Sequence, residues 1–302
     1  AHRLAQNDLV SGNGPTSGSD VTVNHLHYSL LGDPALALNL PMHQIVVDSI
    51  NGIPVAGAAT LPMLKAGSIA RMAGHIEGAD DFRGVITATV RDSKETVTCR
   101  LNDTGKDGAE KAFEYKDRTK TLFQGTDSVR GGKFAFSFAV PLDINYSNQS
   151  GLVNLYAVNT AKTLSAHGSS EQFTVGESEE QKNDSIGPSI YCYLNSPSFV
   201  DGGNVNTTPF FVAKIIDKDG INAAGSGIGH DLQLVIDGDM SKTYVLNSNF
   251  IYDFGTYTSG STYYSIPQLE PGKHELTFRA WDIQNNSSTV KLRFNVVKAL
   301  SP

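Results

Sequence analysis

The chain has 302 residues, of which 39% are hydrophobic and only 18% are charged, and its formal net charge is −7 at pH 7. It has no block of lysine or arginine, which argues against nucleic-acid binding, and no run of about eighteen apolar residues that would span a membrane as a helix. Frequent glycine, serine, threonine and asparagine residues are typical of an extracytoplasmic β-protein, and the length suggests about two domains.

Residues 1–41 read as the end of a domain. Leu4, Ala5 and Leu9 suit the last turns of a helix, and residues 11–20 have the composition of a loop. The stretch HYSLLGDPALALNLP, residues 27–41, contains a short apolar strand that runs into a Gly-Asp-Pro turn. The first ten residues are too polar for a signal peptide, so we expect any export signal to lie outside this sequence.

A first set of strands is predicted from alternating apolar and polar residues between residues 42 and 176. In the strand from Lys133 to Val140, the side chains of Phe134, Phe136 and Phe138 fall on one face, which predicts a buried aromatic face. The predicted strands are Ile45–Ser49, Ser68–Ile76, Gly84–Asp92, Thr119–Phe123, Lys133–Val140, Leu152–Val158 and Glu171–Val175.

Residues 177–188 are almost free of apolar side chains and read as a linker. A second strand set follows, with turn residues at intervals of about ten residues. We therefore predict a mainly β protein in which two immunoglobulin-like β-sandwich domains occupy residues 42–176 and 189–302. The strands predicted for the second domain are Ser189–Leu194, Phe210–Asp217, Leu232–Asp237, Thr243–Leu246, Thr262–Ile266, His274–Trp281 and Val290–Val297.

The two cysteines are too few for a disulfide framework. Cys99 shares a strand face with Val97 and Leu101, and Cys192 shares one with Ile190 and Leu194. Both thiols are therefore expected to be reduced and buried, each in the core of a different domain.

Several motifs resemble one family. HYSLLGDPALALNLP resembles the segment that closes the caspase-like catalytic domain of the gingipain-type cysteine peptidases. The stretches GKFAFSFAVPLDINYS, FFVAKIIDKDGINAAGSGIGHDLQLVIDG, YVLN and GKHELTFRAWDIQNNSS resemble the region downstream of that domain in the sortases of type IX secretion. The resemblance covers roughly residues 20–297 and implies that residues 1–41 are the tail of a caspase-like α/β catalytic domain.

The family's cysteine and histidine pair would lie upstream of Gly32-Asp33-Pro34, and neither cysteine of this chain lies there. The resemblance thus implies no catalytic residue in this chain, and we expect the chain alone to be inactive. For the whole protein it implies removal of C-terminal sorting signals from secreted cargo and transfer of the cargo to lipopolysaccharide, on the outer face of the bacterial outer membrane. The implied partners are the upstream catalytic domain, the cargo proteins and outer-membrane secretion components.

The sequence predicts no cofactor other than calcium. Asp217-Lys218-Asp219-Gly220 alternates oxygen donors around a glycine, as calcium loops do, and Asp282 could complete the ligands. The motif lacks the downstream glutamate of an EF-hand. The alternative is a tight turn in which aspartate and glycine satisfy the backbone geometry.

Two histidines and one group of aromatic residues are further candidates for a functional site. His167 imitates a catalytic histidine motif but stands in a serine-rich stretch that reads as a solvated loop, and His230 is expected to be a hydrogen-bonded turn residue. The aromatic residues are expected either to form a contact surface for glycans or proteins or to cover the core. They are Tyr252, Phe254, Tyr257, Tyr263 and Tyr264.

The leading interpretation is the non-catalytic, bracing region of a surface sortase. A stand-alone bacterial adhesin and a structural stalk of immunoglobulin-like modules remain as alternatives, because a fold resemblance alone does not give a function. In the leading interpretation, the apolar residues of 1–41 dock onto the upstream catalytic domain.

Overall fold

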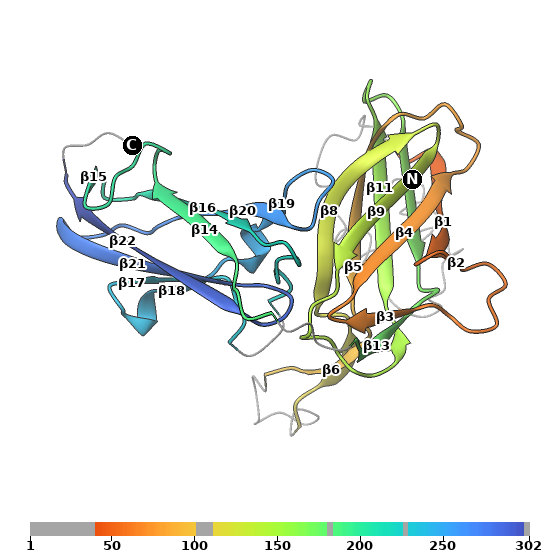
Figure 1. The fold of residues 1–302 in the computed structure, drawn as a ribbon, viewed down its shortest axis with the longest axis horizontal. Helices are drawn as coiled ribbons and strands as arrows, with labels where there is room; N and C mark the ends of the chain where they lie inside the picture. Colours follow the sequence, from red (N-terminus) through yellow and green to blue (C-terminus); the bar gives the residue numbers. More distant parts are fainter. Residues whose placement is uncertain (1–39, 101–110, 180–183, 226–228, 299–302) are drawn as a thin grey trace, which may run out of the picture. The chain divides into compact units, whose positions relative to one another are not determined.

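A computed structural model describes residues 40–100, 111–179, 184–225 and 229–298 (Figure 1). The described residues from Pro41 onward belong to one compact unit. The helix end, strand and turn predicted for residues 1–41, and with them the caspase-like remnant, lie almost wholly outside the described residues. Within these residues the regular elements are β-strands and two short 3-10 helices, as expected for a mainly β protein.

The first strand set closes into a seven-stranded barrel in the order β12-β11-β5-β8-β9-β4-β1, because β1 also pairs in parallel with β12. The sequence had predicted a two-sheet sandwich here. Alternation identifies which face of a strand is buried but cannot show that the first and last strands meet. The strands are β1 (His43–Ile50), β4 (Ile69–Ile76), β5 (Gly84–Arg91), β8 (Thr121–Arg130), β9 (Lys133–Ala139), β11 (Leu152–Asn159) and β12 (Ser165–Ser170), with β2 (Ile53–Pro54) beside β1.

The aromatic face of β9 fills the barrel core, as predicted. Phe134, Phe136 and Phe138 are 5%, 4% and 0% exposed. The ring of Phe123 on β8 stacks on that of Phe138, with centroids 5.2 Å apart. Burial of such rings supplies much of the stability of a small core.

A small sheet in the order β10-β13-β3 accompanies the barrel. Its middle strand occupies Thr174–Ser178, three residues later than the start predicted at Glu171, and it extends into the segment predicted as linker. The side chain of Phe173, next to this strand, is fully buried. The outer strands are β10 (Gln149–Ser150) and β3 (Met63–Ala66).

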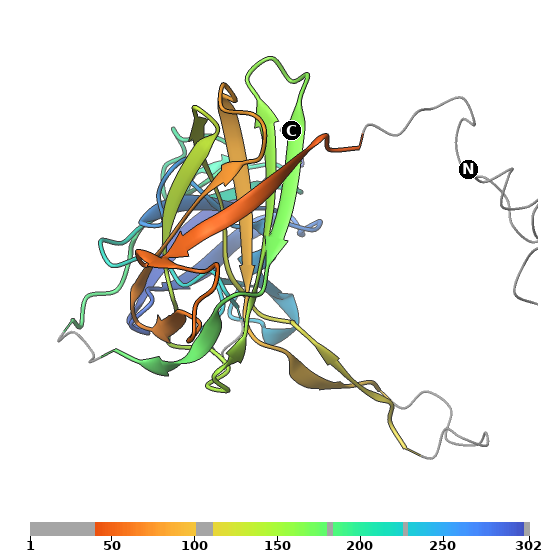
Figure 2. The same cartoon turned by 90° about the vertical axis from the view of Figure 1, so that its right-hand side faces the viewer.

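A two-stranded hairpin, β6 (Glu95–Thr98) with β7 (Glu114–Asp117), extends away from the barrel (Figure 2). Every residue of β7 is exposed. Cys99, which follows β6, is exposed as well, so the prediction that this thiol is buried was wrong. The alternation around Cys99 is real, but no second layer covers either face of the hairpin among the described residues.

The second strand set consists of two sheets that share one core, in which the rings of Phe211 and Phe278 lie 5.2 Å apart. This agrees with the predicted two-layer arrangement, whereas the immunoglobulin-like assignment stays a prediction. One sheet has the order β14-β16-β20-β19 and the other β15-β22-β21-β17-β18. The strands are β14 (Ser189–Leu194), β15 (Asn204–Val205), β16 (Phe210–Ile216), β17 (Gln233–Ile236), β18 (Thr243–Val245), β19 (Ile251–Tyr252), β20 (Ser259–Ser265), β21 (Gly272–Trp281) and β22 (Ser287–Val296); the 3-10 helices are η1 (Met240–Lys242) and η2 (Asn247–Asn249).

Candidate functional site

Asp217 and Asp219, two of the predicted calcium ligands, lie in the turn after β16. Oδ1 of Asp217 accepts hydrogen bonds from the amides of Asp219, at 2.8 Å, and Gly220, at 3.2 Å. Burial raises the pKa of Asp217 above its ordinary value. The carboxylate of Asp219 pairs with Lys218 at 3.1 Å. These contacts are those of a turn whose backbone is fixed by aspartate oxygens.

Asp282, the third predicted ligand, follows β21 and is fully buried. Its Oδ1 accepts from the amides of Gln284, at 2.9 Å, and Asn286, at 2.7 Å, and its Oδ2 accepts from Nδ2 of Asn286 at 2.8 Å. Burial raises the pKa of Asp282, and the charge of Asp217 adds to that rise.

The oxygens of Asp217 and Asp282 are thus already engaged by amides of their own turns. In the part of the chain that the structure describes, no group of three or more His, Cys, Asp or Glu side chains is arranged to hold a metal ion. The calcium site stays a prediction, and the turn interpretation accounts for the observed hydrogen bonds.

His230 takes part in a polar junction between the barrel and the second strand set. Asp143, in the loop after β9, accepts from Nδ2 of Asn222 at 2.9 Å, and its Oδ2 lies 2.8 Å from Nδ1 of His230. The imidazole packs against the indole of Trp281 at 4.5 Å. His230 is therefore a hydrogen-bonded residue, as predicted, and we call this group the Asp143 junction.

His167 lies in strand β12, where it pairs with Tyr156 of β11 and Gln44 of β1. The prediction that it belongs to a solvated loop was wrong in its secondary structure, although the side chain is exposed. Serine and glycine around it weakened the alternation signal.

The predicted aromatic group is divided between the core and the surface. Tyr252 is 5% exposed, and its hydroxyl donates to the carbonyl of Ile221 at 2.7 Å. Tyr257 and Tyr264 are partly buried against the core. Phe254 and Tyr263 are 58% and 43% exposed. Most of the group therefore covers the core, and the rest does not form one surface by itself.

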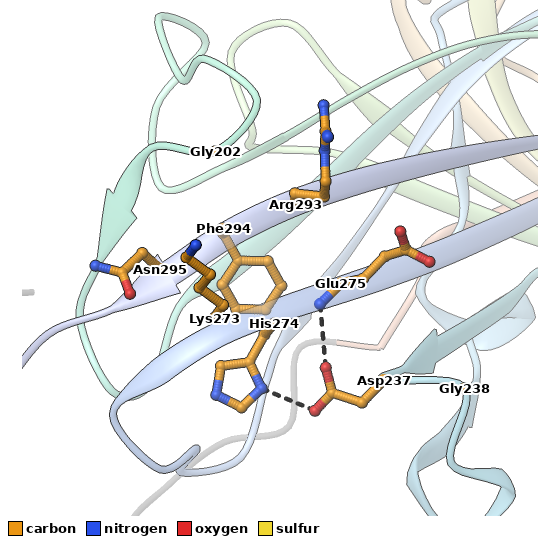
Figure 3. Close-up of a pocket in the computed structure, with 9 residues that line it drawn as sticks. All are labelled: Gly202, Asp237, Gly238, Lys273, His274, Glu275, Arg293, Phe294 and Asn295. Atoms are coloured by element: carbon orange, nitrogen blue, oxygen red, sulfur yellow. Dashed lines mark hydrogen bonds and ion pairs between the residues drawn. The ribbon is translucent and has the colours of Figure 1, made fainter.

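A cavity of about 820 Å³ lies at one end of the second strand set (Figure 3). His274 Nδ1 is 2.8 Å from Oδ2 of Asp237, and its Nε2 is 2.8 Å from the carbonyl oxygen of Glu270. The imidazole stacks on Phe294, with centroids 5.5 Å apart. The lining residues are Gly202, Asp237, Gly238, Lys273, His274, Glu275, Arg293, Phe294 and Asn295.

Most charges of this cavity are compensated locally. Arg293 pairs with Asp201, Glu275 pairs with Lys291 at 3.1 Å, and Asp237 also accepts from the amide of Glu275 at 3.0 Å. Its lining residues include no serine, threonine or cysteine that the His274 imidazole could activate as a nucleophile. The contacts of Asp237 with His274 and with the amide of Glu275 hold the Asp237-Gly238 turn against β21.

Sequence reasoning missed Asp143 and the pair of Asp237 and His274. The partners of Asp143 lie 79, 87 and 142 residues further along the chain, and Asp237 and His274 are 37 residues apart. No local spacing rule connects residues so distant. A long specific string around His230 was the only signal that pointed near the junction.

No protein-family model matches the chain, and no curated protein matches it. Among solved structures, the chain is similar to PorU from Porphyromonas gingivalis, known from the crystal structure of its dimeric latent form. The two chains are 32% identical, the alignment covers 99% of this chain, and the TM-score is 0.54. The chain spans only 28% of the length of PorU.

A red sea bream transglutaminase structure also aligns with 86% of this chain and 32% of its own, at 9% identity and a TM-score of 0.25. A likeness at that level carries no argument. The similarity to PorU, in contrast, agrees with the relation to type IX secretion that the sequence motifs indicate, for a segment of PorU and not for its whole length.

Proposed function

We propose that this chain is the non-catalytic, bracing region of a gingipain-type cysteine peptidase that acts as a sortase in type IX secretion. The observation that carries the proposal is the 32% identity to PorU over 99% of this chain. The relation covers the chain almost completely, so it includes the barrel, the junction and the second strand set.

The state of the two cysteines supports placing the catalytic cysteine upstream of this chain. Burial raises the pKa of Cys192 to about 11, so its sulfur is a thiol and a poor nucleophile at neutral pH. Cys99 is exposed beside the hairpin and does not line the cavity described above.

The Asp143 junction supports the bracing role. Two backbone hydrogen bonds also join the barrel to the second strand set. The amide of Leu142 donates to the carbonyl of Ile283 at 3.3 Å, and the amide of Gly255 donates to the carbonyl of Thr126 at 2.9 Å. Hydrogen bonds at several points restrict relative movement more than a linker alone does. A restrained pair of β units would hold a catalytic domain at a constant distance from whatever the far unit contacts.

In this proposal the whole protein removes C-terminal sorting signals from cargo and transfers the cargo to lipopolysaccharide at the outer face of the outer membrane. Cargo proteins and outer-membrane secretion components are its partners. For the chain itself, no helix among the described residues is long and apolar enough to span a membrane.

The test compares three proteins: this chain alone, the upstream catalytic region together with residues 1–41, and the catalytic region joined to the whole chain as in the parent protein. We expect cleavage of sorting-signal peptides and transfer to the anchor only where the catalytic region is present, with transfer reduced at least tenfold when residues 42–302 are removed. Thiol-dependent cleavage by this chain alone, lost in Cys99→Ala, would refute the proposal. Equal transfer by the catalytic region without residues 42–302 would refute the bracing role.

A further inference from the structure

The outer face of the sheet β14-β16-β20-β19 is apolar and aromatic. Strand alternation points Cys192, Phe211 and Ala213 into the core, so their neighbours face outward. The register places Tyr193, Val212 and Tyr263 side by side across three strands. We call this outward surface the tyrosine face, and its largest members are Tyr191, Tyr193, Phe210, Ile216, Ile251 and Tyr263.

The large side chains of the tyrosine face are unusually exposed. Ile251 is 60% exposed, Ile216 59% and Tyr191 52%. Phe210 and Tyr263 stack on each other with centroids 6.0 Å apart and remain 40% and 43% exposed. Contiguous apolar surface of this kind on a soluble protein marks an interaction site more often than isolated exposed residues do.

The opposite face of the same strand set differs in chemistry. The outer side of β21 and β22 carries Lys273, Glu275, Lys291 and Arg293, and three of these ions are paired, Lys291 with Glu275 at 3.1 Å and Arg293 with Asp201. The outward positions of the tyrosine face hold serine, tyrosine, phenylalanine, valine and isoleucine residues and one ion, Lys214. The apolar side chains are therefore concentrated on the tyrosine face, whereas charged side chains dominate the outer side of β21 and β22.

Lys214 lies at the middle of the tyrosine face, where the register sets it between Tyr191 of β14 and Ser261 of β20. Among the described residues no carboxylate forms an ion pair with it. A partner that covered this face would bury an ammonium group, which is unfavourable unless the partner supplies an opposite charge.

We propose that the tyrosine face is the docking surface for another protein, whose matching surface is apolar and presents an aspartate or glutamate carboxylate to Lys214. Tyrosine-rich, charge-poor surface is characteristic of the energetic centre of protein interfaces. The inference concerns a surface to which the bracing role assigns no partner, and it does not depend on that role.

Two other occupants fit less well. A second copy of this chain, docked face to face, would offer Lys214 no carboxylate, because the outward positions of these four strands hold no aspartate or glutamate. A lipid surface gains its electrostatic attraction from clusters of cations, whereas this face carries one cation on a chain of net charge −7.

The test places a photoreactive p-benzoylphenylalanine at Tyr263 in the full-length protein within the bacterium that makes it. The same residue at Lys291, on the charged face, serves as the matched control. We expect irradiation to link position 263, but not position 291, to one protein of different sequence. The cross-linked peptide should contain or adjoin an aspartate or glutamate.

Charge reversal then tests the role of Lys214. Lys214→Glu should lower the cross-linking yield at position 263 at least tenfold, and replacing the partner's carboxylate residue by lysine should restore it. Lys291→Glu should leave the yield unchanged. The thermal midpoint of each variant shows whether it folds; if Lys214→Glu does not, Lys214→Met takes its place, with loss of yield again expected. A cross-link to a second copy, to a lipid or glycan, or to nothing overturns the proposal, as does a yield that Lys214 does not affect.

Discussion

Asp282 shows how much one buried carboxylate can organise. It is fully buried and accepts three hydrogen bonds within the turn between β21 and β22. Asp282→Ala leaves these donors without their acceptor, and each unsatisfied buried group costs about 1–3 kcal/mol. We expect Asp282→Ala to lower the free energy of unfolding by at least about 2 kcal/mol in urea titrations. Asp282→Asn keeps Oδ1, which accepts from the two backbone amides of the turn, and should therefore lower the unfolding free energy less. Equal losses in the two variants would contradict this role of Oδ1.

The raised pKa of Asp282 should also make the stability of the protein depend on pH. Burial raises its pKa above the ordinary value of 3.8, so the folded state binds the proton more tightly than the unfolded state does. The stability contributed by this group therefore falls as pH rises through the raised pKa, and it recovers as pH falls from 7 toward 4. We expect the unfolding free energy of wild type minus that of Asp282→Asn to increase over that descent. A difference that is constant or decreases would show that the carboxylate does not titrate as described.

The two cysteines should differ sharply in reactivity. Cys99 is exposed, whereas Cys192 is 7% exposed and its pKa is raised by burial to about 11. Ellman's reagent should therefore titrate one thiol rapidly in the native protein and the second only after unfolding. Cys99→Ser should abolish the rapid phase, and Cys192→Ser should leave it unchanged.

Residue-level predictions succeeded where a second layer exists to cover the strand. The alternation in β9 correctly placed three phenylalanines in the core, and the same reasoning correctly buried Cys192. The identical argument failed for Cys99, because an isolated hairpin alternates without burying either face. The turn aspartates were recognised as turn or metal residues, but the long-range partners of Asp143 could not be read from any local pattern.

At the scale of elements, the closure of the barrel depends on Gly168. A Cβ atom at this position of β12 would lie 2.1 Å from the carbonyl oxygen of Ile45 on β1, at the seam that closes the barrel. Overpacking of a well-packed core costs about 1–3 kcal/mol. We expect Gly168→Ala to lower the thermal midpoint and to speed hydrogen exchange at the β1–β12 seam. Ser169→Ala, exposed on the same strand, is the control; if both changes have the same effect, the seam does not require glycine.

Most strands were predicted within a few residues, since alternation is strong in β4, β5, β9, β11 and β14. Strand β12 was missed because SAHGSS offers one small apolar residue and no bulky apolar side chain. Its place in the structure is set by its neighbours β11 and β1, which pair with it from both sides. No single segment could therefore predict the barrel, because its closure depends on how the complete sheet pairs.

At the scale of the whole molecule, Asp143 should couple the barrel to the second strand set. Each of its hydrogen bonds as a charged acceptor contributes about 1.5–3 kcal/mol. Calorimetry of residues 41–302 should show one cooperative transition for the wild type and a broadened or divided transition for Asp143→Ala. Asp237→Ala removes a contact within the second set alone and should keep one transition. An unchanged peak shape in Asp143→Ala would mean that the junction carries no coupling.

The hairpin of β6 and β7 has a consequence for how the chain could be divided. It leaves the barrel between β5 and β8, which are directly paired, and it exposes Lys111 and Lys116 to a trypsin-like protease. A cut there would break the chain after β6. The hydrogen bonds between β5 and β8 and between β1 and β12 would still hold the two fragments together. Each fragment would lack some of the seven barrel strands, so we expect the barrel to form only while both fragments stay together.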